Sequence, residues 1–181
     1  NTLEGLLETP LEGTLPTNNK VISVNDKEII NTNIMFSKIK DFKTYLSSFN
    51  LNKSYFLIAY KFWKLWEKEN PNNKTIQDAK VSKWYDAIRL IIDVDKQPID
   101  RILVIYFYFE KCQQDESGFD RFWFDTIKSV GALRVKDKFD VYRIDKIIDI
   151  VNRKINQDPS FRNLVGKKIK DFERYESTEL H

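Results

Sequence analysis

The sequence predicts an all-α protein, a compact bundle of about six to seven helices that follows an extended N-terminal arm. Apolar residues recur at three-to-four spacing in several successive segments, which is the period of a helix that buries one face. Short polar turns separate these segments, as in a bundle with short connections. The 181 residues include 41% hydrophobic and 14% aromatic side chains, which suffices for one packed core.

The first 35 residues are predicted to be a linker or an extended arm. Residues 1–20 contain two glycines and two prolines, which oppose a long helix. Their leucines leave open a second interpretation, an arm that binds a partner. Residues 21–35 fit either a short hairpin that turns at Asn25-Asp26 or a helix that begins near Asp26, and the pattern favours neither.

A single helical domain is expected over residues 36–176, followed by a tail at 177–181. Its first two helices are predicted at 36–49 and 55–69, and Ser54 is a candidate cap for the second. Three aromatic residues of the second helix are either core or, beside their lysines, a surface that stacks nucleic-acid bases. Burial preferences favour the core. These residues are Phe62, Trp63 and Trp66, beside Lys61, Lys64 and Lys68.

The next two helices are predicted around an acidic turn at residues 93–96. The first spans about 75–91, with Asp78 at the capping-box position. The second, 98–113, is apolar on nearly all sides, so its composition also suits a buried strand. Pro98 at its start favours a helix, and its apolar character makes that helix the expected centre of the bundle.

The last third is predicted to be helical with one loop. The expected elements are a short helix capped by Ser117 and ending near residue 127, a turn or short helix at 129–134, a loop at 137–140, a long helix from 142 to about 155, and a last helix over 161–175 that packs through Leu164 and Ile169.

The scarcity of cysteine and histidine excludes several kinds of active site. Cys112 is the only cysteine, and it is expected to be a small buried apolar side chain rather than part of a disulfide. His181, the last residue, is the only histidine. Most zinc sites, serine-type triads and histidine acid–base chemistry are therefore excluded.

No other motif indicates catalysis, a cofactor or a metal. Gly166-Lys167-Lys168 lacks the preceding glycine and the following Ser or Thr of a phosphate-binding loop. Asp93, Asp95 and Asp100 are better explained as caps and dipole partners at helix ends than as metal ligands. We therefore expect a protein that is not an enzyme, with no cofactor and no metal.

The protein is predicted to be located in the cytoplasm. The sequence has no run of about 18 apolar residues and no signal-peptide layout at its start. A single cysteine suits a reducing compartment. Because the chain starts at Asn1 rather than Met, we expect it to be a processed or excised piece.

Positive charge gathers in the last third of the chain. Residues 1–120 carry 16 Lys and Arg against 17 Asp and Glu, whereas residues 121–181 carry 14 against 10. Cations beside exposed aromatic rings suit single-stranded nucleic acid, through phosphate attraction and base stacking. The predicted phosphate contacts are Lys128, Arg134, Lys136, Lys138, Arg143, Lys146, Arg153 and Lys154, with Trp123 and Tyr142 as stacking or anchor residues.

The competing interpretation of this region is an ordinary core with solvated charges. Phe122, Trp123, Leu133 and Phe139 would then be buried, and residue type alone favours that outcome. Charge reversal at Arg134 and Lys136 tests the DNA interpretation, which predicts that the double variant binds DNA more weakly while the domain stays folded.

The stretch from Trp84 to Lys136 has an order of residues that resembles a known family. It reads Trp84, Arg89-Leu90, Asp93, Asp95, Ile99, Ile102 and Ile105, then Phe122-Trp123, Ile127, Ser129, Leu133-Arg134 and Lys136. This order resembles the C-terminal region of phage and prophage replication proteins, the initiators or replisome organisers that help load the helicase. Many of these carry a W…R.L…D.R…I…VI segment followed by FW…I.S…LR.KF.

The resemblance lies between about Phe62 and Phe139, its quoted residues span about a third of the chain, and it has departures. Lys96-Gln97 stands where Arg or Lys-Arg is usual, the spacer before Phe122 is longer, and residues 130–132 replace a Ser-Pro-type turn. The resemblance implies a module that contacts single-stranded DNA, the replicative helicase or its loader. It also implies a winged-helix origin-binding domain upstream, joined through residues 1–20.

Two other function classes stay open. One is a pure protein-interaction module, such as an adaptor or an inhibitor of a host factor, with no DNA affinity. The other is a viral structural or assembly protein, which would self-associate. A membrane partner is not expected.

Overall fold

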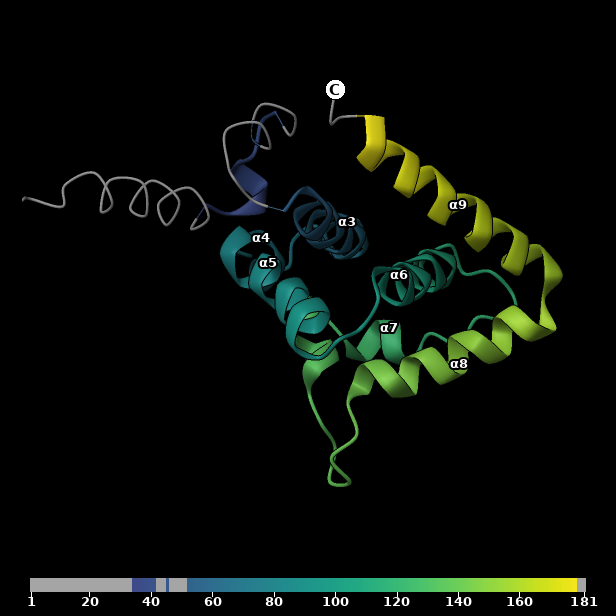
Figure 1. The fold of residues 1–181 in the computed structure, drawn as a ribbon. Helices are drawn as coiled ribbons and strands as arrows, with labels where there is room; N and C mark the ends of the chain where they lie inside the picture. The colour runs from purple at the N-terminus through teal and green to yellow at the C-terminus, as the bar shows by residue number, and fades with distance from the viewer. Residues whose placement is uncertain (1–33, 42–44, 46–51, 179–181) are drawn as a thin grey trace, which may run out of the picture.

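The computed structural model describes residues 34–41, 45 and 52–178 of the chain (Figure 1). Within these residues the fold is all-α, as the sequence predicts, and its β pairing consists of two isolated bridges. The predicted arm with its alternative hairpin falls largely on residues 1–33, which lie outside the described residues, as does the end of the tail at 179–181.

The described chain enters the fold through a short 3-10 turn, η1 (Phe36–Lys38), where a longer helix was predicted. The Phe36 ring is buried and stacks on Trp63, with 5.3 Å between ring centroids. Its amide donates to the carbonyl of Ala79 (3.1 Å), so the backbone here pairs with a distant segment instead of continuing a helix. Of the residues at 42–51, position 45 alone is described, and it is helical.

Helix α3 (Lys53–Glu69) begins two residues earlier than predicted, because a different residue caps it. The Asn52 side chain accepts the amide of Tyr55 (3.2 Å), and Ser54 lies inside the helix. The aromatic residues Phe62, Trp63 and Trp66 are buried, which confirms the core interpretation over the base-stacking surface.

The helix predicted over 75–91 is divided into α4 (Lys74–Gln77), α5 (Val81–Arg89) and a π-helical turn, η2 (Leu90–Val94). Asn73 caps α4 by accepting two backbone amides, so Asp78 ends this helix rather than starting it. The break follows from the pairing with the entering chain, since residues 35 and 80 form an antiparallel bridge.

Helix α6 (Ile99–Gln113) is the centre of the bundle, as predicted, and is not a strand. It packs against α3 and α7 as well as the two C-terminal helices (Figure 1). Its side chains are buried on most sides, and Cys112 is fully buried as expected.

The remaining elements are α7 (Phe122–Thr126), the 3-10 turn η3 (Val130–Arg134), α8 (Arg143–Gln157) and α9 (Pro159–Thr178). Ser117 was the predicted cap, but it is the Asp120 side chain that accepts a hydrogen bond from the amide of Phe122, the first residue of α7 (2.9 Å). Helix α9 starts at its proline and continues two residues beyond the expected domain end at 176. Leu164 and Ile169 pack against the core only in part, and the fully buried residues of α9 are Phe161, Val165 and Phe172.

One arginine joins three of these elements. The Arg121 guanidinium forms ion pairs with Glu69 (2.6 Å), Asp115 (2.6 Å) and Asp125 (3.2 Å), and it donates to the carbonyl of Cys112 (2.7 Å). It therefore links the ends of α3 and α6 to the start of α7. The hydrogen bonds to Asp125, Glu69 and Asp115 raise the pKa of Arg121, whose guanidinium is charged at any ordinary pH.

Candidate interaction surface

A short hairpin between η3 and α8, residues 135–142, carries the most exposed large apolar side chain of the described residues. It extends away from the helices at the bottom of Figure 1. Its two arms are joined by a bridge between residues 136 and 142. The amide of Arg143 donates to the carbonyl of Val135 (2.9 Å), and the amide of Asp137 donates to that of Val141 (3.0 Å).

A single carboxylate organises the tip of the hairpin. Asp137 accepts the backbone amides of Phe139 (2.7 Å) and Val141 (3.1 Å) and forms an ion pair with Lys146 of α8. The ammonium of Lys146 and these amides hold the pKa of Asp137 below its ordinary value. Asp140 closes the turn in the left-handed region, at φ 63°. The loop predicted at 137–140 is therefore an ordered turn.

The hairpin presents apolar side chains to solvent. Phe139 is 73% exposed, and Val135 and Val141 are exposed as well. The ammonium of Lys138 lies 5.0 Å from the centroid of the Phe139 ring. Large apolar side chains gathered on one protruding element are a common mark of a contact surface. The core interpretation of Phe139 is therefore wrong.

Four of the eight predicted phosphate contacts are ion-paired within the chain. Arg134 donates two hydrogen bonds to Asp95 (2.6 and 3.0 Å), and the Asp95 side chain is only 6% exposed. A positive charge that is balanced by a nearby carboxylate attracts a phosphate weakly. The other three pairs are Lys136–Asp140 (2.8 Å), Lys146–Asp137 and Lys154–Asp158 (3.1 Å).

Lys128, Lys138, Arg143 and Arg153 have no carboxylate within 4.0 Å among the residues that the structure describes. These four do not form one compact group. Arg143 and Arg153 lie ten residues apart on α8, which is about 15 Å along a helix axis. Salt at about 0.1 M screens charges beyond about 10 Å.

The predicted stacking residues are both half-buried. Trp123 makes an edge contact with Phe122, at 5.1 Å between ring centroids. The Lys136 ammonium lies 4.7 Å from the centroid of the Tyr142 ring. The neighbour Phe122, assigned to the core by residue type, is 60% exposed. Its place at the first position of a short helix, next to an arginine, was the signal that could have suggested exposure.

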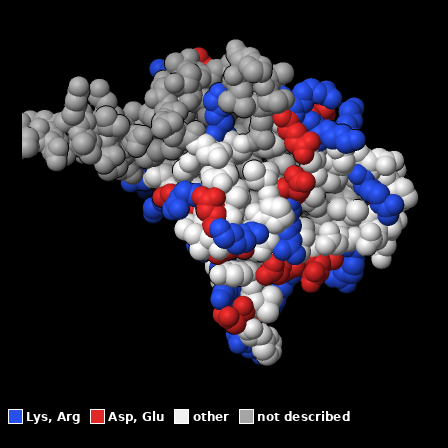
Figure 2. Space-filling view, in the orientation of Figure 1, with Lys and Arg blue, Asp and Glu red and all other residues white. Residues whose placement is uncertain are grey.

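Figure 2 shows how charge is distributed on one face of the molecule. Blue and red groups alternate along it, and the hairpin at the bottom carries both before it ends in uncharged atoms. Counted over residues 135–142, Lys136 and Lys138 balance Asp137 and Asp140. The hairpin is therefore electrically neutral and apolar at its end.

The buried cysteine and the acidic residues of the described chain were compared with the requirements of a reactive thiol and of a metal site. Burial raises the pKa of the Cys112 thiol to about 12, so this thiol is not a nucleophile at neutral pH. Among the described residues, no cluster of His, Cys, Asp and Glu has the arrangement of a metal site. In the same part of the chain, no helix combines the length and apolar character needed to cross a membrane.

Comparison of the chain with protein-family models, with curated proteins and with solved structures found no match.

Proposed function

We propose that this chain is a non-catalytic binding domain of a DNA-replication assembly, and that it contacts a protein partner there through the hairpin 135–142. The proposed partner is the replicative helicase or its loader, because the resemblance of Trp84–Lys136 to phage and prophage replication proteins implies such a partner. The observation that carries the proposal is the exposed Phe139 ring on an ordered, neutral hairpin.

The chemistry of the hairpin favours a protein over a nucleic acid as its partner. Aromatic side chains that fill a pocket supply most of the energy of many protein interfaces. Asp137 already holds the turn, so little conformational entropy is lost when Phe139 enters such a pocket. The neutral charge of the hairpin gives no long-range attraction to phosphates. The expected partner surface has an apolar pocket bordered by groups of both signs.

DNA is a second candidate partner, and one observation supports it. Lys128, Lys138, Arg143 and Arg153 lack a carboxylate partner among the described residues, so their charges are available to phosphates. Their wide spacing predicts weak binding, which added salt weakens further.

The test is a binding experiment with the immobilised chain and three analytes: the helicase and the loader of the source organism, and a single-stranded oligonucleotide. We expect Phe139→Ser to weaken helicase or loader binding by about tenfold or more, as for an interface anchor. Val94→Ser is the matched control, because Val94 is 57% exposed on the turn η2. It should bind as the unmodified chain does.

Three results decide between the candidates. Affinity for a protein analyte that depends on Phe139 and changes little with salt supports the proposal. Affinity for the oligonucleotide alone, lost at moderate salt and lowered by Arg143→Gln, supports the DNA candidate instead. Equal loss of protein binding in Phe139→Ser and Val94→Ser would exclude the hairpin as the specific contact.

A further inference from the structure

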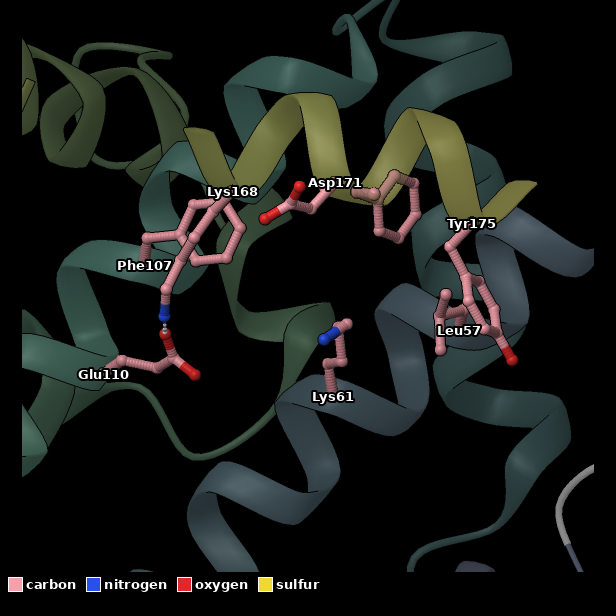
Figure 3. A pocket seen from close by; sticks show the side chains of 8 residues that line it. Leu57, Lys61, Phe107, Glu110, Lys168, Asp171 and Tyr175 are labelled. Atoms are coloured by element: carbon pink, nitrogen blue, oxygen red, sulfur yellow. Dashed lines mark hydrogen bonds and ion pairs between the residues drawn. The ribbon is translucent and has the colours of Figure 1, made fainter. Parts of the chain in front are cut away.

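A cleft of about 320 Å³ lies between α3, α6 and α9 (Figure 3), and none of its lining residues belongs to the hairpin. Its apolar and aromatic lining residues are Leu57 from α3, Phe107 from α6, and Phe172 and Tyr175 from α9, and four charged side chains complete the lining. The volume is at the lower end of the range of about 300–1,000 Å³ that small-molecule sites occupy. The cleft therefore has room for a small organic ligand.

One cation of this cleft, Lys61, forms no ion pair with a carboxylate of the described residues. Figure 3 shows the Lys61 side chain rising from α3 toward the open space, while Lys168 and Glu110 face each other at one end. Lys168 and Glu110 are joined at 2.5 Å, so their charges cancel. No carboxylate of the described residues lies within 4.0 Å of Lys61. Its ammonium instead lies 5.5 Å from the centroid of the Tyr106 ring.

The surroundings make the Lys61 charge costly. Burial lowers the pKa of Lys61, and the nearby Lys168 ammonium lowers it further, while Glu110 opposes both. A partly desolvated ammonium without a counter-ion is stabilised when an anion arrives. The fourth charged group of the cleft, Asp171, lies 3.7 Å from Arg174 on the same helix. The Lys61 ammonium is thus the charged group with which an anionic ligand would pair.

We infer that the cleft is a binding site for a small organic carboxylate with an aromatic or branched apolar body. The carboxylate pairs with the Lys61 ammonium, and the body packs between Phe107 and Phe172. Charge complementarity selects the anion, and the apolar walls select a ligand that is otherwise uncharged. This site is independent of the proposed partner contact at the hairpin.

The experiment compares 4-phenylbutyrate with its neutral amide, 4-phenylbutanamide, by ligand-detected NMR and titration on the full chain. The acid should bind about tenfold more tightly, as expected for a charge-assisted hydrogen bond. Lys61→Met keeps the aliphatic stem and removes the charge, so it should abolish the preference for the acid. Lys64→Met is the matched control, because Lys64 lies three residues along the same helix, pairs with Glu67 (3.5 Å) and lies outside the cleft.

Two outcomes overturn the inference. Equal affinity for the acid and the amide, or no binding of either at millimolar concentration, would mean that the cleft holds no such ligand. A preference for the acid that survives Lys61→Met would place the anion elsewhere. The first result is measured on the unmodified chain, and a variant that fails to fold would lose the preference for the acid rather than keep it, so a folding defect produces neither result.

Discussion

Two arginines near the base of the hairpin illustrate how differently the fold uses the same side chain. Arg134 of η3 forms a bidentate ion pair with Asp95, whose carboxylate is nearly buried in the turn after α5. Arg143, the first residue of α8, has no such partner among the described residues. The sequence assigned both to DNA contacts. The geometry makes Arg134 a structural residue first, so charge reversal there tests stability as well as binding.

We predict that Arg134→Leu lowers the free energy of unfolding by about 2–4 kcal/mol, because it leaves the Asp95 carboxylate buried without its cation. The estimate lies below the full cost of a buried pair, since the arginine side chain is 28% exposed. Urea denaturation followed by circular dichroism measures the change. Arg143→Leu is the control, and its effect should stay within about 0.5 kcal/mol. Similar losses in the two variants would contradict the distinction.

At the scale of the element, the hairpin owes its shape to one side chain. Asp137 accepts two amides across the turn and pairs with Lys146, so the turn is fixed from inside and anchored to α8. A carboxylate whose pKa is lowered in the folded state stabilises the fold at pH values above its unfolded-state pKa. That contribution is lost as the pH falls through the folded-state value. The hairpin should therefore be insensitive to pH until the solution is distinctly acidic.

We predict that the amide chemical shifts of Phe139 and Val141 change with a midpoint below 3.8, the ordinary pKa of the Asp137 carboxyl. An NMR titration from about pH 7 to about pH 2 measures this midpoint. Lys146→Met removes the largest cause of the lowered pKa and should move the midpoint upward. A midpoint at or above 3.8 in the unmodified chain would show that Asp137 does not hold the turn.

The sequence predicted best those elements whose shape depends on local pattern. Helices α3 and α8 follow from apolar spacing, whereas α6 is apolar on nearly all sides and was distinguished from a strand by its proline start. The break between α4 and α5 could not be predicted in this way. It depends on backbone hydrogen bonds to residues 34 and 36, more than 40 positions earlier in the chain. Local caps were also misassigned, because neighbouring Asn and Ser residues have similar capping preferences.

At the scale of the whole molecule, the charges were the least predictable feature. Arg134 and Asp95 are 39 residues apart, Arg121 and Glu69 are 52 apart, and Lys168 and Glu110 are 58 apart. Composition identifies a basic last third, but only the fold decides which of its cations are neutralised. The same holds for the exposed rings of Phe122 and Phe139, whose residue type predicts burial. The cleft at Lys61 likewise exists only where three helices meet.

The hairpin depends on features at all three scales for its proposed role as a partner contact. Side chains at the base of the hairpin secure it to the bundle, Asp137 fixes its turn, and the helices carry it away from the core toward solvent. The result is an apolar tip, held in a hydrogen-bonded turn, on a surface of mixed charge. Such a surface suits a specific protein partner more than a uniformly charged polymer.

The most direct measurement places the photo-reactive amino acid p-benzoylphenylalanine at position 139 and identifies its crosslinks by mass spectrometry in cells of the source organism. The change preserves the aromatic ring of the exposed residue, so the contact should survive. We predict crosslinks to the replicative helicase or its loader from position 139, and none from position 94, which is also exposed. Crosslinks to DNA from position 139, or the same protein adducts from both positions, would contradict the account.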